Sequence, residues 1–523
     1  MRWSVLASLA IACGGSGGKS PTEARVGDAL AARFPLARLD DRALCDQLLA
    51  RDKLAYEVEV DPEPRTRRKV IVSDLHLGPG TQDPRFAGLE DFYSDGEWSA
   101  MLDREAATGT IDLIVAGDFV EFWQLATVLG ALPRLEDPSQ PEGAVLGSDQ
   151  AFAVTAIELV IAAHPEVFRA IGRLLDRGDH RVILVAGNHD ADLLWPKVQL
   201  AIARAVNARD PTRLMFVQAA AYQHAGVYVA HGHAYDAANR FATGHAPFGR
   251  DRDGRCRLQT NWGEVFVDRF YTESERQIPF IDNLYPESAA ILWALRDNPD
   301  RARDLGAAVR ALDLLKAAHG KGLNRDAVGS ILQGVFGAPG SGGAGPGSPG
   351  EIFDHVADRL TKGDRSAESL VNALMGLTYD PDLAQLRTGL LDAARALPDM
   401  PAALRALQRI DPAALSKLQD RLFGDSLETA AQRLLDARDV DVVVFGHTHH
   451  VGGLVKRIGT REHAGHYANT GSWIAVASVA DLRARKIGWN QLSLADRTMF
   501  PSKRTVIVVD YDEDGAPLAP VIR

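Results

Sequence analysis

The chain has 523 residues, of which 46% are hydrophobic and 24% are charged, a composition typical of a globular protein with more than one domain. The net charge is -11 and no long basic run occurs, so the sequence lacks the electrostatic footprint of a nucleic-acid-binding protein. An acidic protein that handles an anionic substrate must bind it locally, through metal ions or a few arginines.

The N-terminal segment 1–20 resembles a secretory signal followed by a glycine-rich linker. Arg2 precedes a short apolar run that ends in Ala10-Ile-Ala-Cys13. This ending is similar to a bacterial lipoprotein cleavage site, which predicts a lipid anchor at Cys13 and a place in the cell envelope. The alternative is a cytoplasmic protein with a disordered N-terminus. No later segment has the apolar length of a membrane span.

Residues 21–60 are predicted to form a helical N-terminal extension without recognisable chemistry. The remaining cysteines, Cys45 and Cys256, are widely spaced and form no C-x-x-C zinc motif. One disulfide between these two residues is compatible with the sequence, which leaves their pairing open.

Five short apolar runs end abruptly in acidic, amide or imidazole side chains. Each run is rich in Val and Ile and has the length of a strand that is buried on both faces. In open α/β sheets, ligands bind at the carboxyl ends of the strands, so we expect the five ends to meet at one site. The runs and the motifs that follow them are 69–73 with Asp74-Leu-His76, 111–116 with Gly117-Asp118, 181–186 with Gly187-Asn188-His189-Asp190, 227–230 with His231-Gly-His233, and 440–445 with Gly446-His447-Thr-His449.

The spacing within these motifs favours a metal site. Side chains at i and i+2 of an extended chain point the same way, so Asp74 and His76 are expected to reach one point together, as are His447 and His449. Carboxylate, imidazole and amide ligands without thiolate suit hard and borderline divalent ions. The motifs supply seven such side chains, enough for two ions if one carboxylate is shared.

This ordered set resembles the calcineurin-like metallophosphoesterases, whose pattern is D-x-H, G-D, G-N-H-[DE], H and G-H-x-H. The resemblance implies an α/β fold, a four-layer αββα sandwich, formed here by residues 61–240 and 431–523. It also implies that a hydroxide activated by two divalent ions (Mn, Fe, Zn or Co) hydrolyses a phosphate ester or pyrophosphate. Carried over by position, the first ion would be bound by Asp74, His76, Asp118 and His449, and the second by Asp118, Asn188, His231 and His447.

The same resemblance gives His189 the role of a proton donor or charge stabiliser at the scissile phosphate, with Asp190 orienting its imidazole. The segment 117–123 is also similar to the G-D-x-x-E-x-W motif of UDP-2,3-diacylglucosamine hydrolases, which makes Glu121 and Trp123 candidate substrate-binding residues. Helix-surface and core-packing roles for these two residues are the alternative.

A departure from that enzyme group follows the fourth strand. His233 stands where those hydrolases have an Asp, so their substrate does not transfer to this chain. His233, Asp236, Asn239 and Arg240 recur at nearly helical spacing, which makes His233 a candidate substrate contact and Arg240 a candidate phosphate ligand. A solvated helix face is the alternative.

Residues 241–430 separate the fourth motif from the fifth. Amphipathic spacing and Ala/Leu-rich segments predict a mostly helical insertion in two parts, joined by the Gly/Pro/Ser-rich linker 337–350. Because the insertion leaves and rejoins beside predicted ligand strands, it is expected to cap the site. An apolar inner face would suit an acyl or isoprenoid substrate, and a cap that packs only on itself is the alternative. A last core strand is predicted at 505–510.

The sequence thus predicts a metal-dependent phosphoesterase that acts on a phosphorylated small molecule or lipid. A UDP-sugar or lipid pyrophosphatase is an alternative within the same class of enzyme. A catalytically silent metal- or ligand-binding envelope protein is the alternative from another class.

Overall fold

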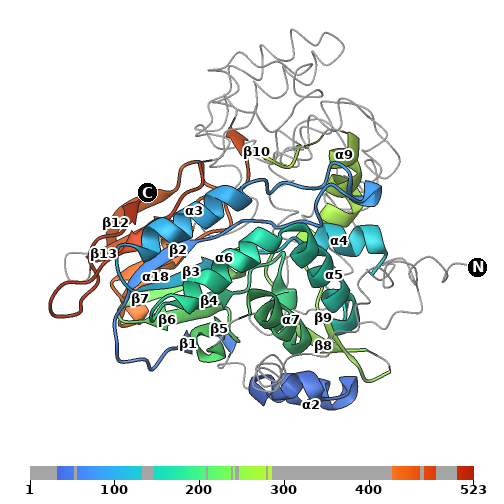
Figure 1. Ribbon diagram of the computed structural model, residues 1–523, viewed down its shortest axis with the longest axis horizontal. Coiled ribbons are helices and arrows are strands. Elements are labelled where there is room, and N and C mark those ends of the chain that lie inside the picture. Colours follow the sequence, from blue (N-terminus) through green and yellow to red (C-terminus); the bar gives the residue numbers. More distant parts are fainter. Residues whose placement is uncertain are drawn as a thin grey trace, which may run out of the picture.

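A computed structural model describes most of the predicted core and the first part of the predicted insertion (Figure 1). Cys13, the linker 337–350 and most of the insertion lie outside the described residues. The described residues are 32–51, 56–131, 146–207, 210–236, 239–241, 247–251, 253–277, 279, 281–285, 427–459, 464–478 and 503–523.

The core belongs to the mixed α/β class and contains two six-stranded mixed sheets. The first sheet has the strand order β16-β15-β2-β3-β4-β5, in which β2 to β5 are parallel. Its strands are β2 (Arg68–Val72), β3 (Ile111–Ala116), β4 (Arg181–Val185), β5 (Leu214–Phe216), β15 (Ile507–Val509) and β16 (Val521–Ile522). The second sheet has the order β1-β6-β7-β11-β13-β12. Its strands are β1 (Glu59–Val60), β6 (Ala221–His224), β7 (Val227–Ala230), β11 (Val442–Phe445), β12 (Leu454–Gly459) and β13 (Ala464–Asn469).

Alternating side chains bury both faces of each sheet. In β3, Leu113 packs in the cluster beneath the helices, whereas Ile114 belongs to a cluster shared with Val229 of the second sheet. The two sheets therefore pack face to face. On the far side of the second sheet, Val443 packs with Leu435 of helix α18.

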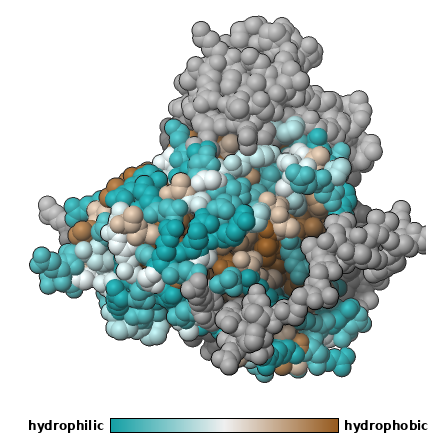
Figure 2. Space-filling model, viewed as in Figure 1, coloured by the Kyte–Doolittle hydropathy of each residue, from teal (hydrophilic) through white to brown (hydrophobic). Residues whose placement is uncertain are grey.

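Helices cover the outer faces of both sheets (Figure 1). Helices α3, α5, α6 and α7 lie on the first sheet, and the surface over α3 and α6 is mostly hydrophilic (Figure 2). Among the described residues, no single helix is long and apolar enough to cross a membrane, although the bent pair α5 and α6 together meets that length and composition test. The helices are α2 (Asp41–Leu49), α3 (Asp95–Ala106), α4 (Phe122–Leu129), α5 (Gln150–Ala163), α6 (Pro165–Asp176), α7 (Pro196–Val206), α8 (Trp262–Phe266), α9 (Thr272–Gln277) and α18 (Leu427–Ala437).

The predicted core strands are all present, with ends that shift by no more than two residues. Several of the described strands were not predicted, among them β1, which ends the predicted helical extension 21–60, and β13. The sequence around His466 reads as a loop, but this residue lies in β13, which pairs with β11 on one side and β12 on the other. The local composition of β13, Ala-Gly-His-Tyr-Ala-Asn, is a weak strand signal, so the pairing with two neighbours decides its conformation.

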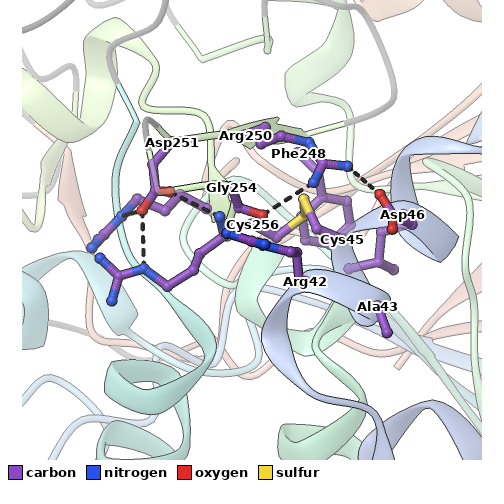
Figure 3. Close-up of a disulfide and its surroundings, with 12 residues drawn as sticks. Arg42, Ala43, Cys45, Asp46, Phe248, Arg250, Asp251, Gly254 and Cys256 are labelled. Atoms are coloured by element: carbon purple, nitrogen blue, oxygen red, sulfur yellow. Dashed lines mark hydrogen bonds and ion pairs between the residues drawn. A yellow bond between two sulfur atoms is a disulfide. The ribbon is translucent and has the colours of Figure 1, made fainter.

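The described start of the insertion contains a hairpin as well as helices. Strands β8 (Phe248–Arg250) and β9 (Cys256–Leu258) pair with each other, and the short β10 (Leu284–Tyr285) pairs with β14 (Ala477–Ser478). A disulfide between Cys45 and Cys256 joins α2 to β9 (Figure 3). The N-terminal extension is thereby tied covalently to the beginning of the insertion.

Candidate metal centre

The motifs at the five strand ends come together where the two sheets meet. One group of side chains contains Asp74, His76 and His449, and a second contains Asp118, His231 and His447. In each group, one potential ligand atom of every residue lies within 4.8 Å of the others. Each group combines residues from both sheets, as expected if the strand ends form a single site.

Asp118 connects the two groups. Its Oδ2 lies 2.9 Å from Nε2 of His231 and 3.7 Å from Nε2 of His76. Its Oδ1 accepts a hydrogen bond from the backbone N–H of His189 at 3.0 Å, which fixes the carboxylate. Although burial opposes ionisation, His231 and His189 hold the pKa of Asp118 well below its usual range. One oxygen of an ionised carboxylate thus faces an imidazole from each group.

Several atoms that face the centre lack a hydrogen-bond partner although they are buried. Asp74 Oδ2 accepts from the backbone N–H of His447, whereas Asp74 Oδ1 has no backbone or hydroxyl donor and lies 3.2 Å from Nε2 of His449. Asn188 donates from Nδ2 to Asn239 and leaves its Oδ1 without a donor. Because buried polar atoms are rarely left unpaired, this pattern fits atoms that ligate a cation.

Three of the four predicted imidazole ligands are also oriented for ligation through Nε2, whereas Nε2 of His447 faces Asp236. His231 Nδ1 lies 2.9 Å from the carbonyl oxygen of Ala116, which fixes the ring and leaves Nε2 facing Asp118. Nε2 of His76 and Nε2 of His449 lie 3.2 Å apart. Two imidazole nitrogens this close together can both bind one cation.

Backbone strain gathers at the same residues. Five non-glycine residues of the centre adopt positive φ angles, which L-amino acids seldom occupy. Such conformations cost on the order of 1–3 kcal/mol each and persist only where surrounding contacts hold them, typically at functional sites. The five residues are Asp74 (φ 53°), His76 (48°), Asp118 (51°), His447 (71°) and His449 (46°).

Two glycines admit the close approach of these motifs. A Cβ on Gly187 would collide with Oδ1 and the backbone nitrogen of Asp118. A Cβ on Gly117, whose φ is 89°, would collide with the imidazole of His231. The glycines of the G-D and G-N-H-D motifs are therefore required by the packing of the centre.

His189 is held at the edge of the centre by Glu121 and Trp123. Glu121 Oε2 lies 2.6 Å from Nδ1 of His189 and 3.0 Å from Nδ1 of His76. The indole of Trp123 stacks on the His189 ring with centroids 3.9 Å apart. Glu121 also caps α4 by accepting from the backbone N–H of Gln124. The two residues are buried, but they contact the predicted catalytic histidine rather than serving core packing alone.

Glu121 and His189 stabilise each other in their charged forms. Burial lowers the pKa of His189, but Glu121 and Asp118 outweigh it and raise that pKa to about 9. Burial raises the pKa of Glu121, but His189 and His76 outweigh it and lower that pKa to about 2. At neutral pH, Glu121 is therefore an anion paired with a protonated His189.

Asp190 has a different role from the one expected. Its hydrogen bonds within the described chain come from backbone N–H groups, among them Gly187 at 2.5 Å and Phe119 at 2.6 Å. It therefore joins the loop after β3 to the loop after β4. Glu121, not Asp190, orients the His189 imidazole, which corrects the expectation. The G-D-x-x-E-x-W motif held the signal for this role of Glu121.

Residues after β7 add a second layer around the centre. Asp236 Oδ2 lies 2.9 Å from Nε2 of His447 and accepts from Nδ2 of Asn239 at 2.6 Å. Asn239 in turn accepts from Asn188 at 3.4 Å. Asp236 and Asn239 thus orient two of the predicted ligands, a role that their helical spacing alone did not indicate.

The two candidate substrate residues of this segment differ in position. His233 is buried, with its ring centroid 5.6 Å from that of His231 and 5.7 Å from that of Phe241. Arg240 is exposed, and the described residues show no ion pair or hydrogen bond of its guanidinium with the centre. The structure therefore places His233 beside the centre, and phosphate binding by Arg240 stays a prediction.

No protein-family profile, curated protein or solved structure matches this chain. The function is therefore argued from the geometry of the centre. That geometry supplies two groups of nitrogen and oxygen donors, a carboxylate between them, and an imidazole at the rim that is oriented by a carboxylate.

Proposed function

We propose that the protein is a metal-dependent phosphoesterase of the calcineurin-like type, with its two sheets and outer helices forming the four-layer αββα sandwich of that family. One observation carries the proposal: a single oxygen of Asp118 faces His231 of one ligand group and His76 of the other. A carboxylate in this position is suited to bridge two cations. A structural site for one ion would not need it.

The donor set fits two divalent ions. Asp74, His76, Asp118 and His449 would hold the first, and Asp118, Asn188, His231 and His447 the second. Imidazole, carboxylate and amide donors suit Mn, Fe, Zn or Co. When bound, such ions supply a hydroxide near neutral pH and neutralise phosphate oxygens.

The chain's own residues supply orientation and proton transfer. The His189 side chain is 19% exposed, so a ligand can reach it. Glu121 occupies its Nδ1 and Trp123 covers one ring face, which leaves Nε2 to donate to a phosphate oxygen or to the leaving group. Because Glu121 bonds both His189 and His76, it couples the proton donor to a metal ligand.

The substrate class is a phosphorylated small molecule or lipid. A UDP-sugar or lipid pyrophosphatase is the second candidate, supported by the contacts of Glu121 and Trp123 with His189. The disulfide favours an oxidising compartment, so it supports a location in the cell envelope, with a lipid anchor at Cys13.

Hydrolysis of p-nitrophenyl phosphate and its bis-ester in the presence of manganese tests the proposal. We expect the wild type to hydrolyse at least one of them, and His189→Ala and Asp118→Ala to lose most of that activity. His466→Ala, a half-buried histidine in β13 outside the centre, is the matched control and should retain it. If the wild type binds manganese but behaves like both variants on a panel of phosphate esters and pyrophosphates, the protein is a binding protein instead.

A further inference from the structure

A second acidic cluster lies outside the ligand motifs. Asp91 comes from the loop before α3, Glu275 from α9, and Asp282 from the segment that leads into β10. One carboxylate oxygen from each lies within 4.8 Å of the others. Asp91 and Glu275 are buried, and Asp282 is partly exposed. None of the three belongs to a motif that the proposed phosphoesterase activity uses.

Among the described residues, no basic side chain forms an ion pair or hydrogen bond with this cluster, although the imidazoles of His189 and His449 exert an electrostatic influence on Asp282. The nearest hydrogen-bonding groups are neutral amides: Gln124 Nε2 donates to Glu275 Oε2, and Asn283 Nδ2 donates to Asp91 Oδ1, each at 2.6 Å. Burial and repulsion from Asp282 raise the pKa of both Asp91 and Glu275 well above the usual range. Three carboxyl groups are therefore gathered in a poorly solvated place without a cationic side chain in direct contact.

Three oxygen atoms at the cluster also lack a hydrogen-bond donor. They are Oε1 of Glu275, Oε1 of Gln124 and Oδ1 of Asn283. Glu275 is 0% exposed and Asn283 is 1% exposed, so bulk solvent cannot donate hydrogen bonds to their oxygens. A buried acceptor without a donor is costly, and several at one point indicate a missing partner that accepts oxygen ligands.

We propose that Asp91, Glu275 and Asp282 form a third metal site, separate from the dinuclear centre, for a hard divalent cation that Ca²⁺ matches best. Carboxylate and amide oxygens are the ligands of Ca²⁺ in proteins, at about 2.3–2.6 Å. Oxygens on opposite sides of such an ion lie about 5 Å apart, so three oxygens that all lie within 4.8 Å of one another can reach a single ion.

The position of this site gives the cation a structural role. It would join the loop before α3, helix α9 and the segment 281–283, next to the point where the chain enters the undescribed part of the insertion. Helix α9 lies beside α4 (Figure 1), and Gln124 of α4 bonds to Glu275. Since Glu121 begins that same helix, the cation would also steady the carboxylate that orients His189.

Metal analysis of the whole chain tests this assignment. The protein would be stripped with a chelator, saturated with manganese, dialysed against CaCl2, and analysed for both metals. We expect the wild type to retain one Ca²⁺ per chain, and the double variant Asp91→Asn/Glu275→Gln to lose it while keeping its manganese. Asp118→Asn is the reciprocal variant, which should lose manganese and keep Ca²⁺. Asp282→Asn, at a partly exposed position, gives a milder change if the double variant folds poorly.

Thermal unfolding distinguishes a cation from a shared proton. With a cation, adding Ca²⁺ raises the Tm of the wild type but not that of the double variant. In chelator we expect the double variant to have the higher Tm, because it has no buried carboxyl groups that must take up protons on folding. If the wild type retains no more Ca²⁺ than the double variant, or if its Tm responds to lower pH and not to Ca²⁺, the third site is refuted.

Discussion

Replacing Glu121 with Gln tests how the centre orients its histidines. Glu121 Oε2 lies 2.6 Å from Nδ1 of His189 and 3.0 Å from Nδ1 of His76, while its Oε1 caps α4. A glutamine keeps the size of the side chain and one carbonyl oxygen for the cap, but its NH2 group cannot accept from an imidazole. A hydrogen bond to a charged group contributes about 1.5–3 kcal/mol, which corresponds to about 10- to 150-fold in an equilibrium or rate constant.

We therefore expect Glu121→Gln to lower manganese affinity, kcat/KM or both by about 10- to 150-fold. Manganese titrations of phosphoesterase activity, with circular dichroism to verify folding, measure both quantities. Glu105→Gln is the matched control, because Glu105 is an equally buried carboxylate on α3 that pairs with arginines. A folded Glu121→Gln protein with the manganese dependence and kcat/KM of the wild type would refute this role.

Three further predictions concern close packing, the disulfide and pH. Gly187→Ala should abolish most metal binding in isothermal titration, because its Cβ would collide with Asp118. Gly96→Ala is the control, because no atom lies within 4 Å of a Cβ placed there. This control should leave metal binding unchanged and be neutral or slightly stabilising in thermal unfolding. Cys45→Ser should lower the free energy of unfolding by about 2–5 kcal/mol, because the disulfide joins residues that are 211 positions apart in the sequence. In urea titrations, dithiothreitol should destabilise the wild type and not the variant. Equal effects of dithiothreitol on both proteins would count against the disulfide. Burial lowers the pKa of His164, but Asp95 and Glu90 outweigh it and raise that pKa to about 9. The protonated form of His164 therefore stabilises the fold fully below pH 6.5, and this stabilisation is lost as the pH rises through 9. His164→Gln should therefore cost about 3 kcal/mol at pH 6 and little above pH 9.5, and a cost independent of pH would contradict this.

The strand ends were the most predictable part of the molecule. Val- and Ile-rich runs such as 111–116 and 181–186 are buried on both faces, so composition alone distinguishes them from half-exposed strands. Each polar motif follows such a run directly, and the topology of parallel strands then brings the motifs together. For this reason, the prediction that Asp74, Asp118 and His231 lie close together needed little beyond the topology of the strands.

Features that depend on contacts between distant segments were not predictable in the same way. Glu121 orients His189 across 68 positions of sequence, whereas the adjacent Asp190 was the simpler expectation. Strand β13 is defined by its two neighbours rather than by its own residues. The cluster of Asp91 and Glu275 has no local signal, because each residue alone resembles an ordinary surface carboxylate.

The most direct test of the central claim is anomalous diffraction from crystals of the manganese-loaded protein. We expect two neighbouring manganese peaks, one bound by Asp74, His76 and His449 and the other by Asn188, His231 and His447, with the Asp118 carboxylate bound to both. A single peak, or two peaks that do not share Asp118, would contradict it.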